Sequence, residues 1–280
     1  MNLNTIKRAL RYIIKGVPTK HITVTINQNI SNQRLAGKNI LITGGSRGIG
    51  YYIAKQAIAE GANVLIVARK ENSLKKAQSE LGDKCKILSF DISNVSGMDK
   101  FYSEAFTLFN GRIDCLVNNA GVSFHEGSFR NVTEEGFEAQ FNVNFKGSYF
   151  MAKKYVELAE LHKQSAANVL FITSERGSFC TEIPYGLSKA SIKSLVGSLS
   201  RNLYGKENIR VNALAPGVTA SEMTGHAIDG DYSDANSPIG RIFHPAEMAE
   251  VACFLLSDNS TCISGETIHC DAGRHQSVIN

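Results

Sequence analysis

Tyr185 and Lys189 are the residues whose types and spacing most directly suggest chemistry. They stand four positions apart, and on a helix this spacing places two side chains on one face. An ammonium beside a phenol favours the ionised phenol and typically lowers its pKa by roughly 1 to 3 units from the ordinary value near ~10. The pair therefore predicts a group that exchanges a proton near neutral pH. Taken alone, it is also compatible with an ordinary helix surface.

A glycine-rich turn lies upstream of this pair, at residues 43–50, between a short apolar run and a helical stretch. Glycines let backbone amides approach a phosphate closely, and the N-terminus of the following helix supplies partial positive charge. Gly45 and Gly50 have the spacing of a triphosphate-binding loop, but Tyr51 stands where that loop requires lysine. The turn therefore predicts a pyrophosphate site, and together with the phenol and ammonium it indicates hydride chemistry.

The type of dinucleotide is suggested by the end of the second apolar run, where Arg69 follows. An NAD-binding protein usually places an acid here to accept hydrogen bonds from the ribose hydroxyls. Instead, Arg69 and Arg47 could hold a 2′-phosphate through charge-assisted hydrogen bonds. We therefore predict NADP(H) in preference to NAD(H). The alternative is that both arginines are solvated surface groups.

Residues 37–280 alternate between short apolar runs rich in Ile, Leu and Val and longer helical stretches. The predicted strands span residues 39–43, 63–67, 86–89, 113–117, 168–173, 210–214 and 267–269. The predicted helices span residues 50–60, 72–81, 95–109, 133–162, 185–204 and 245–256. This alternation predicts an α/β fold, a single doubly wound Rossmann domain with a mostly parallel seven-stranded sheet and helices on both faces.

Composition excludes several classes of protein. A chain of 280 residues that is 43% hydrophobic and 20% charged can bury a full core as one large domain. No apolar stretch approaches the ~18 residues of a spanning helix, and Lys15 interrupts the only short apolar run near the N-terminus. The six cysteines form no Cys-x-x-Cys pair and have no clustered histidines beside them. We therefore expect reduced packing cysteines, no metal site and a cytoplasmic protein.

The net charge of +4 conceals an uneven distribution. Nine basic residues precede Glu60, which is the first acidic residue, and the remaining 21 basic residues face 26 acidic ones. The basic character is therefore local to the N-terminal part of the chain. Nucleic-acid binders usually spread Lys and Arg along a whole face, so we expect no nucleic-acid partner.

Residues 1–36 stand apart as a basic N-terminal extension. Apolar residues recur there at helical spacing, and the basic residues fall largely elsewhere around the axis. The apolar positions are Ile6, Leu10, Ile13, Ile14 and Val17. A strand-like alternation follows at 21–26. Peripheral membrane contact through residues 1–20 is one interpretation. We favour the other, in which the helix packs on the main domain or on a partner subunit.

Several motifs occur in the order typical of the short-chain dehydrogenase/reductase family, and the chain resembles that family over nearly all of residues 37–280. The glycine turn, the acid at 91, the Asn-Asn-Ala-Gly run at 118–121 and the Pro-Gly pair at 216–217 carry the resemblance. The residues predicted to bind the cofactor, including the two arginines above, are Gly44, Ser46, Arg47, Gly48, Ile49, Gly50, Arg69, Asp91, Ile92, Asn118, Ala120, Gly121, Tyr185, Lys189, Pro216, Gly217, Thr219 and Ser221.

The same resemblance implies four catalytic residues. Tyr185 is similar to the family's proton donor, and Lys189 to the lysine that lowers its pKa and holds the nicotinamide ribose. Ser174 resembles the serine that steadies the substrate oxygen, with Ser178 as the alternative, and Asn144 resembles the asparagine that anchors a water in the proton relay. Each could singly have a local structural role. Jointly they favour reversible hydride transfer between a carbonyl and a secondary alcohol.

The C-terminal part resembles the branch that includes 3-oxoacyl-carrier-protein reductases and many sugar or polyol dehydrogenases, with Asp271-Ala272-Gly273 in place of the usual Asp-Gly-Gly. The family implies a homo-oligomer, commonly a tetramer, built on the two long helices. The polar segment 219–241 favours a small hydroxylated substrate. A catalytically silent NADP-binding scaffold or sensor remains the alternative function.

Overall fold

A single seven-stranded sheet forms the centre of the molecule. The computed structural model describes residue 23 and residues 33–276, so the predicted N-terminal helix and most of the segment 21–26 lie outside the described residues. The strands are β1 (Asn39–Thr43), β2 (Asn63–Ala68), β3 (Cys85–Ser89), β4 (Cys115–Asn118), β5 (Ala167–Ile172), β6 (Ile209–Pro216) and β7 (Thr267–Cys270). They form one sheet in the order β3-β2-β1-β4-β5-β6-β7, and all six pairings are parallel. The predicted doubly wound fold is confirmed.

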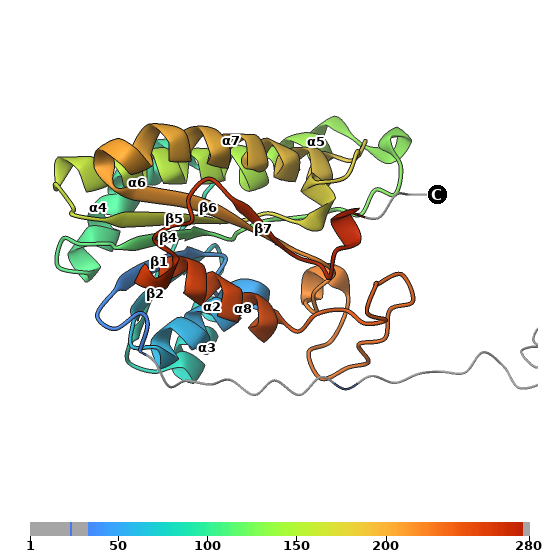
Figure 1. Ribbon diagram of the computed structural model, residues 1–280, viewed down its shortest axis with the longest axis horizontal. Coiled ribbons are helices and arrows are strands. Elements are labelled where there is room, and N and C mark those ends of the chain that lie inside the picture. Colours follow the sequence, from blue (N-terminus) through green and yellow to red (C-terminus); the bar gives the residue numbers. More distant parts are fainter. Residues whose placement is uncertain (1–22, 24–32, 277–280) are drawn as a thin grey trace, which may run out of the picture.

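Helices cover both faces of this sheet. They are α2 (Gly48–Ala59), α3 (Glu71–Leu81), α4 (Met98–Leu108), α5 (Glu134–Phe141), α6 (Ser148–Leu161), α7 (Pro184–Glu207) and α8 (Pro245–Leu256). Figure 1 shows α4, α5, α6 and α7 on one face and α2, α3 and α8 on the other. Among the described residues no helix is long and apolar enough to cross a membrane.

Two hydrophobic cores result, one on each face of the sheet. Successive strand residues point to opposite faces, so Ile40 and Ile42 join the core beneath α2 and α8, while Leu41 joins the core beneath α4 and α6. All three side chains are fully buried. Burying one such side chain contributes about 1.5–3 kcal/mol. This two-sided burial explains why the strands read as continuous apolar runs rather than as alternating ones.

The largest departure from the predicted elements is the long helix expected at 133–162. The structure divides it into α5, a π-helical turn at Asn142–Gly147 and α6. Gly147 lies so close to the backbone of Ile92 that a Cβ there would come within 2.8 Å of the Ile92 carbonyl oxygen. The π turn also places Asn144 in the interior, fully buried. Such single π turns inside α-helices occur frequently at functional sites.

The remaining predicted elements are present with shifted ends. The helix predicted at 95–109 begins with a 3-10 turn at Val95–Gly97 before α4. The fourth strand begins two residues later than predicted, and the sixth extends through Pro216. The apolar pattern identified each element, but the backbone hydrogen bonds of the folded chain decided where each helix and strand ends.

Candidate active site

The strand order reverses between β1 and β4, which lie side by side at the centre of the sheet. In open parallel sheets, ligands bind at such a reversal, beyond the carboxyl ends of the strands. β1 leads into the predicted pyrophosphate turn, and β4 leads into residues 119–121. The two segments that the sequence assigns to the cofactor therefore meet where the topology favours a ligand.

The glycine turn has the backbone geometry of a phosphate cradle. Gly44 and Gly48 have φ values of 65° and 54°, a conformation that favours glycine. A Cβ at Gly44 would come within 2.9 Å of the Cα of Ala120, so the close approach of the two segments requires glycine there. Helix α2 starts in this turn with no side-chain cap and no acid in its first turn. Its first amides are thus free of side-chain acceptors and fit an anionic diphosphate.

Asn119, in the Asn-Asn-Ala-Gly run that carries the resemblance, joins the two segments. Its Nδ2 donates to the carbonyl oxygens of Thr43 and Gly44 at 2.9 and 3.1 Å. In return, the Thr43 hydroxyl oxygen accepts hydrogen bonds from the amides of Asn119 and Ala120 at 3.0 and 3.1 Å. This reciprocal bonding fixes the distance between the loops after β1 and β4. The signal in the sequence was the repeated asparagine at 118 and 119.

Asn118 provides a second indication that this region is built for a polar ligand. The side chain is buried, and neither its amide nitrogen nor its oxygen has a hydrogen-bond partner within the described part of the chain. Buried polar groups are nearly always paired, so an orphaned amide calls for a partner. A dinucleotide bound at this edge fits that requirement.

The two arginines predicted to recognise a 2′-phosphate are paired with acids at the rim of the site. Arg47 contacts Glu222, and Arg69 lies 3.9 Å from Asp91. All four side chains are well exposed, and exposed ion pairs contribute about 0–1 kcal/mol. A phosphate dianion can therefore compete with either carboxylate. Sequence reasoning placed Glu222 in the segment over the substrate and missed its pairing with Arg47, because the two residues are 175 positions apart.

Several other predicted cofactor residues already have internal partners. Asp91 accepts hydrogen bonds from the amide and the hydroxyl of Ser93 at 2.9 and 2.7 Å. The Thr219 hydroxyl is buried and donates to the carbonyl oxygen of Gly217 at 2.9 Å. Ser221 lies beside the glycine turn, with its Cβ 3.6 Å from a Cβ built at Gly48. The loop after β6 therefore borders the glycine turn.

The four predicted catalytic residues lie together on this edge. Tyr185 and Lys189 are on the first turns of α7, with the Lys189 Nζ 5.8 Å from the centroid of the Tyr185 ring. Lys189 is buried, and its Nζ donates to the carbonyl oxygen of Ile172 at 2.9 Å. A Cβ at Gly121 would lie 3.3 Å from Asn144 Oδ1 and 3.4 Å from Lys189 Nζ. The backbone at Gly121 therefore links the predicted cofactor segment to the catalytic group.

The pKa values of the pair differ from the sequence expectation. Burial lowers the pKa of Lys189 to about 8. Burial also raises the pKa of Tyr185, and a hydrogen bond with the Ser174 hydroxyl opposes this shift only in part. The prediction that the pKa of Tyr185 is lowered is therefore wrong for this structure. Desolvation is the largest cause of both pKa shifts, and Lys189 is not among the groups that lower the pKa of Tyr185.

Asn144 and Ser174 are held by backbone contacts. Asn144 Oδ1 accepts from the amide of Val122 at 2.8 Å, and its Nδ2 donates to the Val122 carbonyl oxygen at 2.9 Å. Ser174 is buried, and its hydroxyl oxygen accepts from the amide of Arg176 at 3.2 Å. The alternative serine, Ser178, instead bonds His269 at 2.7 Å. The geometry favours Ser174, the one that interacts with Tyr185.

The chain is similar in sequence to known reductases and dehydrogenases. A family model described as "Enoyl-(Acyl carrier protein) reductase" matches residues 44–275. The 3-oxoacyl-(acyl-carrier-protein) reductase FabG of Chlamydia muridarum is 33% identical over 248 residues, which are 86% of this chain and 99% of that protein. A 2,5-dichloro-2,5-cyclohexadiene-1,4-diol dehydrogenase of Sphingobium indicum is 30% identical over 247 residues, 85% of this chain and 97% of its own.

A solved structure extends the likeness to the fold. The 3-ketoacyl-(acyl-carrier-protein) reductase of Brucella melitensis, complexed with NADH, superposes with a TM-score of 0.78 at 29% identity and covers 86% of this chain and 99% of its own. The fold and the site thus define a Rossmann-type oxidoreductase with a nicotinamide cofactor. The chain belongs to the short-chain dehydrogenase/reductase family, in the branch of the 3-oxoacyl-carrier-protein reductases.

Proposed function

We propose that the protein is an NADP(H)-dependent oxidoreductase that interconverts a small carbonyl compound and a secondary alcohol, with Tyr185 as proton donor and acceptor. The observation that carries this proposal is the meeting of Tyr185, Lys189 and Asn144 at the strand-order reversal, next to a glycine turn with open amides. When bound, the nicotinamide would supply or accept the hydride. The glycine turn would hold its diphosphate.

The chain's own residues handle the proton and the charge. The Tyr185 hydroxyl gives its proton to the developing alkoxide oxygen, and its raised pKa keeps it protonated at neutral pH. Lys189, with a pKa of about 8, is mostly charged there and stabilises the negative charge. Ser174 orients the substrate oxygen. General acid catalysis of this kind contributes about 10²- to 10⁴-fold, and orientation supplies the rest.

Tyr185→Phe tests the assignment. Carbonyl reduction should fall by at least ~10²-fold, because the proton donor is lost, while the Kd for NADPH changes by less than about threefold. Steady-state kinetics and NADPH fluorescence titration measure the two quantities. Tyr204→Phe is the matched control, since Tyr204 lies on the same helix with its hydroxyl on the Thr261 carbonyl oxygen. Undiminished turnover in Tyr185→Phe would falsify the role.

The preference for NADP(H) rests on Arg47 and Arg69 and on the lack of an acid at the end of β2. Arg69→Ala should reduce kcat/KM for NADPH by roughly 10-fold and leave kcat/KM for NADH nearly unchanged, because a charge-assisted bond to the 2′-phosphate contributes about 1.5 kcal/mol or more. Equal KM values of the wild-type enzyme for the two cofactors, or a lower one for NADH, would refute the preference.

We further propose a cytoplasmic homo-oligomer, either a dimer or a tetramer, formed through α6 and α7. The support is a set of exposed apolar side chains on the outer helical face, which includes Phe137, Tyr149 and Leu187. Figure 1 shows the three helices that carry them, α5, α6 and α7, on the same face of the sheet. Large apolar side chains exposed on neighbouring helices fit a contact with another copy of the chain.

A further inference from the structure

The C-terminal turn, residues 271–276, contacts the loop that follows Ser174. Arg274 Nη1 donates to Glu175 Oε1 at 2.9 Å, and His269, at the end of β7, bonds Ser178 at 2.7 Å. Glu175 directly follows the predicted catalytic serine. Two polar bonds therefore connect the C-terminal segment to Glu175 and Ser178, both in the loop between β5 and α7.

The first of these two interactions, the ion pair between Arg274 and Glu175, is largely buried. The Glu175 side chain is 3% exposed and that of Arg274 is 24% exposed. Arg274 is the only ion-pair partner of Glu175 among the residues that the structure describes, and Glu175 Oε2 has no hydrogen bond there. Removing one partner of a buried pair leaves an uncompensated charge and is strongly destabilising locally. Burial already raises the pKa of Glu175, and Arg274 opposes this shift. Without Arg274, either the loop moves to bring the carboxylate to water, or the carboxyl takes up a proton and no longer holds the C-terminal turn.

Such a movement would displace the catalytic residues. The amide of Arg176 donates to the Ser174 hydroxyl oxygen within the 3-10 turn Glu175–Gly177, so this turn orients the hydroxyl. A Cβ at Gly177 would come within 2.7 Å of the carbonyl carbon of Lys189. The loop therefore packs directly on the first part of α7, and a shift of the loop changes the relation of Ser174 to the tyrosine and lysine.

The C-terminal turn is itself rigidly held. Asp271 is buried, and its carboxylate accepts hydrogen bonds from the amides of Gly273 and His275 at 3.0 and 2.9 Å and pairs with the His275 ring at 2.8 Å. That ring stacks on His269, with centroids 3.8 Å apart. A Cβ at Gly217 would lie 3.1 Å from the Asp271 Cα, so the turn also packs against the predicted nicotinamide side of the site.

We propose that the C-terminal turn is a clamp and that Arg274 is a positioning residue for the reaction, acting through Glu175 on the loop of Ser174. This proposal rests on the proposed function for its kinetic consequence. The physical reason is that a buried, charge-assisted bond has one favourable geometry, and the loop that carries Glu175 adopts that geometry.

The test compares Arg274→Met with Arg274→Lys in the full-length protein. Arg274→Met should lower kcat for carbonyl reduction by about 10- to 100-fold, because a misplaced serine weakens orientation, and should change the Kd for NADPH by less than about threefold. Arg274→Lys keeps the charge and should recover most of kcat. The double variant Glu175→Gln with Arg274→Met should recover part of it, since no unpaired charge remains.

The control is Arg34→Met, which removes two ion pairs away from the loop, one with Glu60 of similar burial and one with the exposed Glu250. The thermal stability of Arg34→Met should fall, while its kcat should equal that of the wild-type protein. Hydrogen exchange of the peptide spanning 174–178, measured without added cofactor, should accelerate by about tenfold in Arg274→Met and not in Arg34→Met.

Unchanged exchange of that peptide, or faster exchange with wild-type kcat, would overturn the clamp. If the wild-type enzyme reduces no carbonyl compound, the proposed function fails separately, and the exchange comparison still decides whether Arg274 holds the loop.

Discussion

At the scale of single residues, the site depends on two groups, Tyr185 and Lys189, whose pKa values burial shifts in opposite directions. The pKa of Lys189 falls to about 8, while that of Tyr185 rises above its ordinary value. Reduction requires the tyrosine to hold its proton and the lysine to hold its charge. Both conditions are met at neutral pH, and the lysine is the first to lose its proton as the pH rises.

The pH dependence of reduction follows from this order. We expect kcat/KM for the carbonyl substrate to stay level below about pH 7 and to fall as the pH rises through about 8, where Lys189 becomes neutral. A pH–rate profile from 6 to 10 measures it. Lys189→Met should have a lower rate and no such decline. If kcat/KM still falls above about pH 8 in Lys189→Met, a group other than Lys189 causes the decline.

The same shift has a consequence for stability. The pKa of Lys189 in the folded protein lies below its ordinary value of 10.5, so the unfolded chain binds more protons between about pH 8 and that value. Burial of the charged lysine therefore costs stability below about pH 8, and this cost is relieved as the pH rises. A charge that destabilises the fold yet serves the proposed reaction is an instance of the trade between stability and activity.

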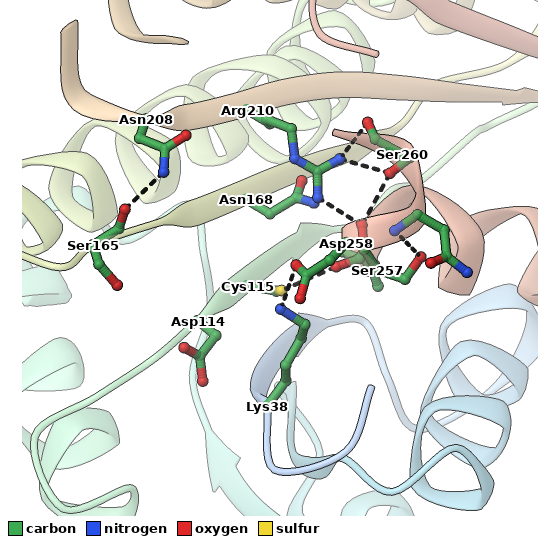
Figure 2. Close-up of polar contacts among 12 residues, drawn as sticks. Lys38, Asp114, Cys115, Ser165, Asn168, Asn208, Arg210, Ser257, Asp258 and Ser260 are labelled. Carbon is green, nitrogen blue, oxygen red and sulfur yellow. Dashed lines mark hydrogen bonds and ion pairs between the residues drawn. The ribbon is translucent and has the colours of Figure 1, made fainter. Parts of the chain in front are cut away.

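At the scale of elements, the end of the sheet opposite the site is held by a buried arginine. Arg210, at the start of β6, donates to the carbonyl oxygens of Leu255, Ser257 and Ser260 at 3.2, 2.8 and 2.9 Å. Figure 2 shows its guanidinium directed at Ser257 and Ser260, with Asn168 beside it. These carbonyls belong to the C-terminal end of α8 and the turn after it, where a cation is favourable.

Arg210→Met should therefore loosen the attachment of α8 without affecting the reaction. We expect a loss of about 2–4 kcal/mol in the free energy of unfolding, because several buried carbonyl groups lose a charged donor. Chemical denaturation measures this loss. The kcat of the folded enzyme should be unchanged, since Arg210 and the candidate site lie at opposite ends of β6. A large decrease in kcat at full folding would show that the two ends are coupled.

At the scale of the whole molecule, the apolar face over α5, α6 and α7 should be an interface between copies of the chain. Analytical ultracentrifugation should give a dimer or a tetramer, and Tyr149→Glu should shift it toward the monomer, because a carboxylate would be buried there. Ile239→Glu is the control, because Ile239 is also an exposed apolar residue but lies in the loop after β6, away from these helices. A monomeric wild-type protein would contradict the proposal.

The basic extension, residues 1–36, is a separate question at this scale. We propose that it packs on the main domain or on a partner subunit. Flotation with anionic vesicles should then be the same for the full-length protein and for a protein that lacks residues 1–20. Flotation of the full-length chain alone would instead support membrane contact through residues 1–20.

The sequence by itself determined the elements and the order of the motifs. Short apolar runs rich in Ile, Leu and Val identified the strands, and the four-residue spacing of Tyr185 and Lys189 placed both on one helix face. These signals are local, since they depend on the period of a helix or strand and on the backbone freedom of glycine. For the same reason the π turn at 142–147 was missed, because it interrupts a helical pattern without changing the apolar spacing.

Only the tertiary structure decided which distant side chains meet and what burial does to their charges. The pairs of Arg47 with Glu222 and of Arg274 with Glu175 join residues 175 and 99 positions apart. No periodicity along the chain reports such contacts. The direction of the Tyr185 pKa shift was likewise decided by desolvation, which depends on how the whole fold excludes water around α7.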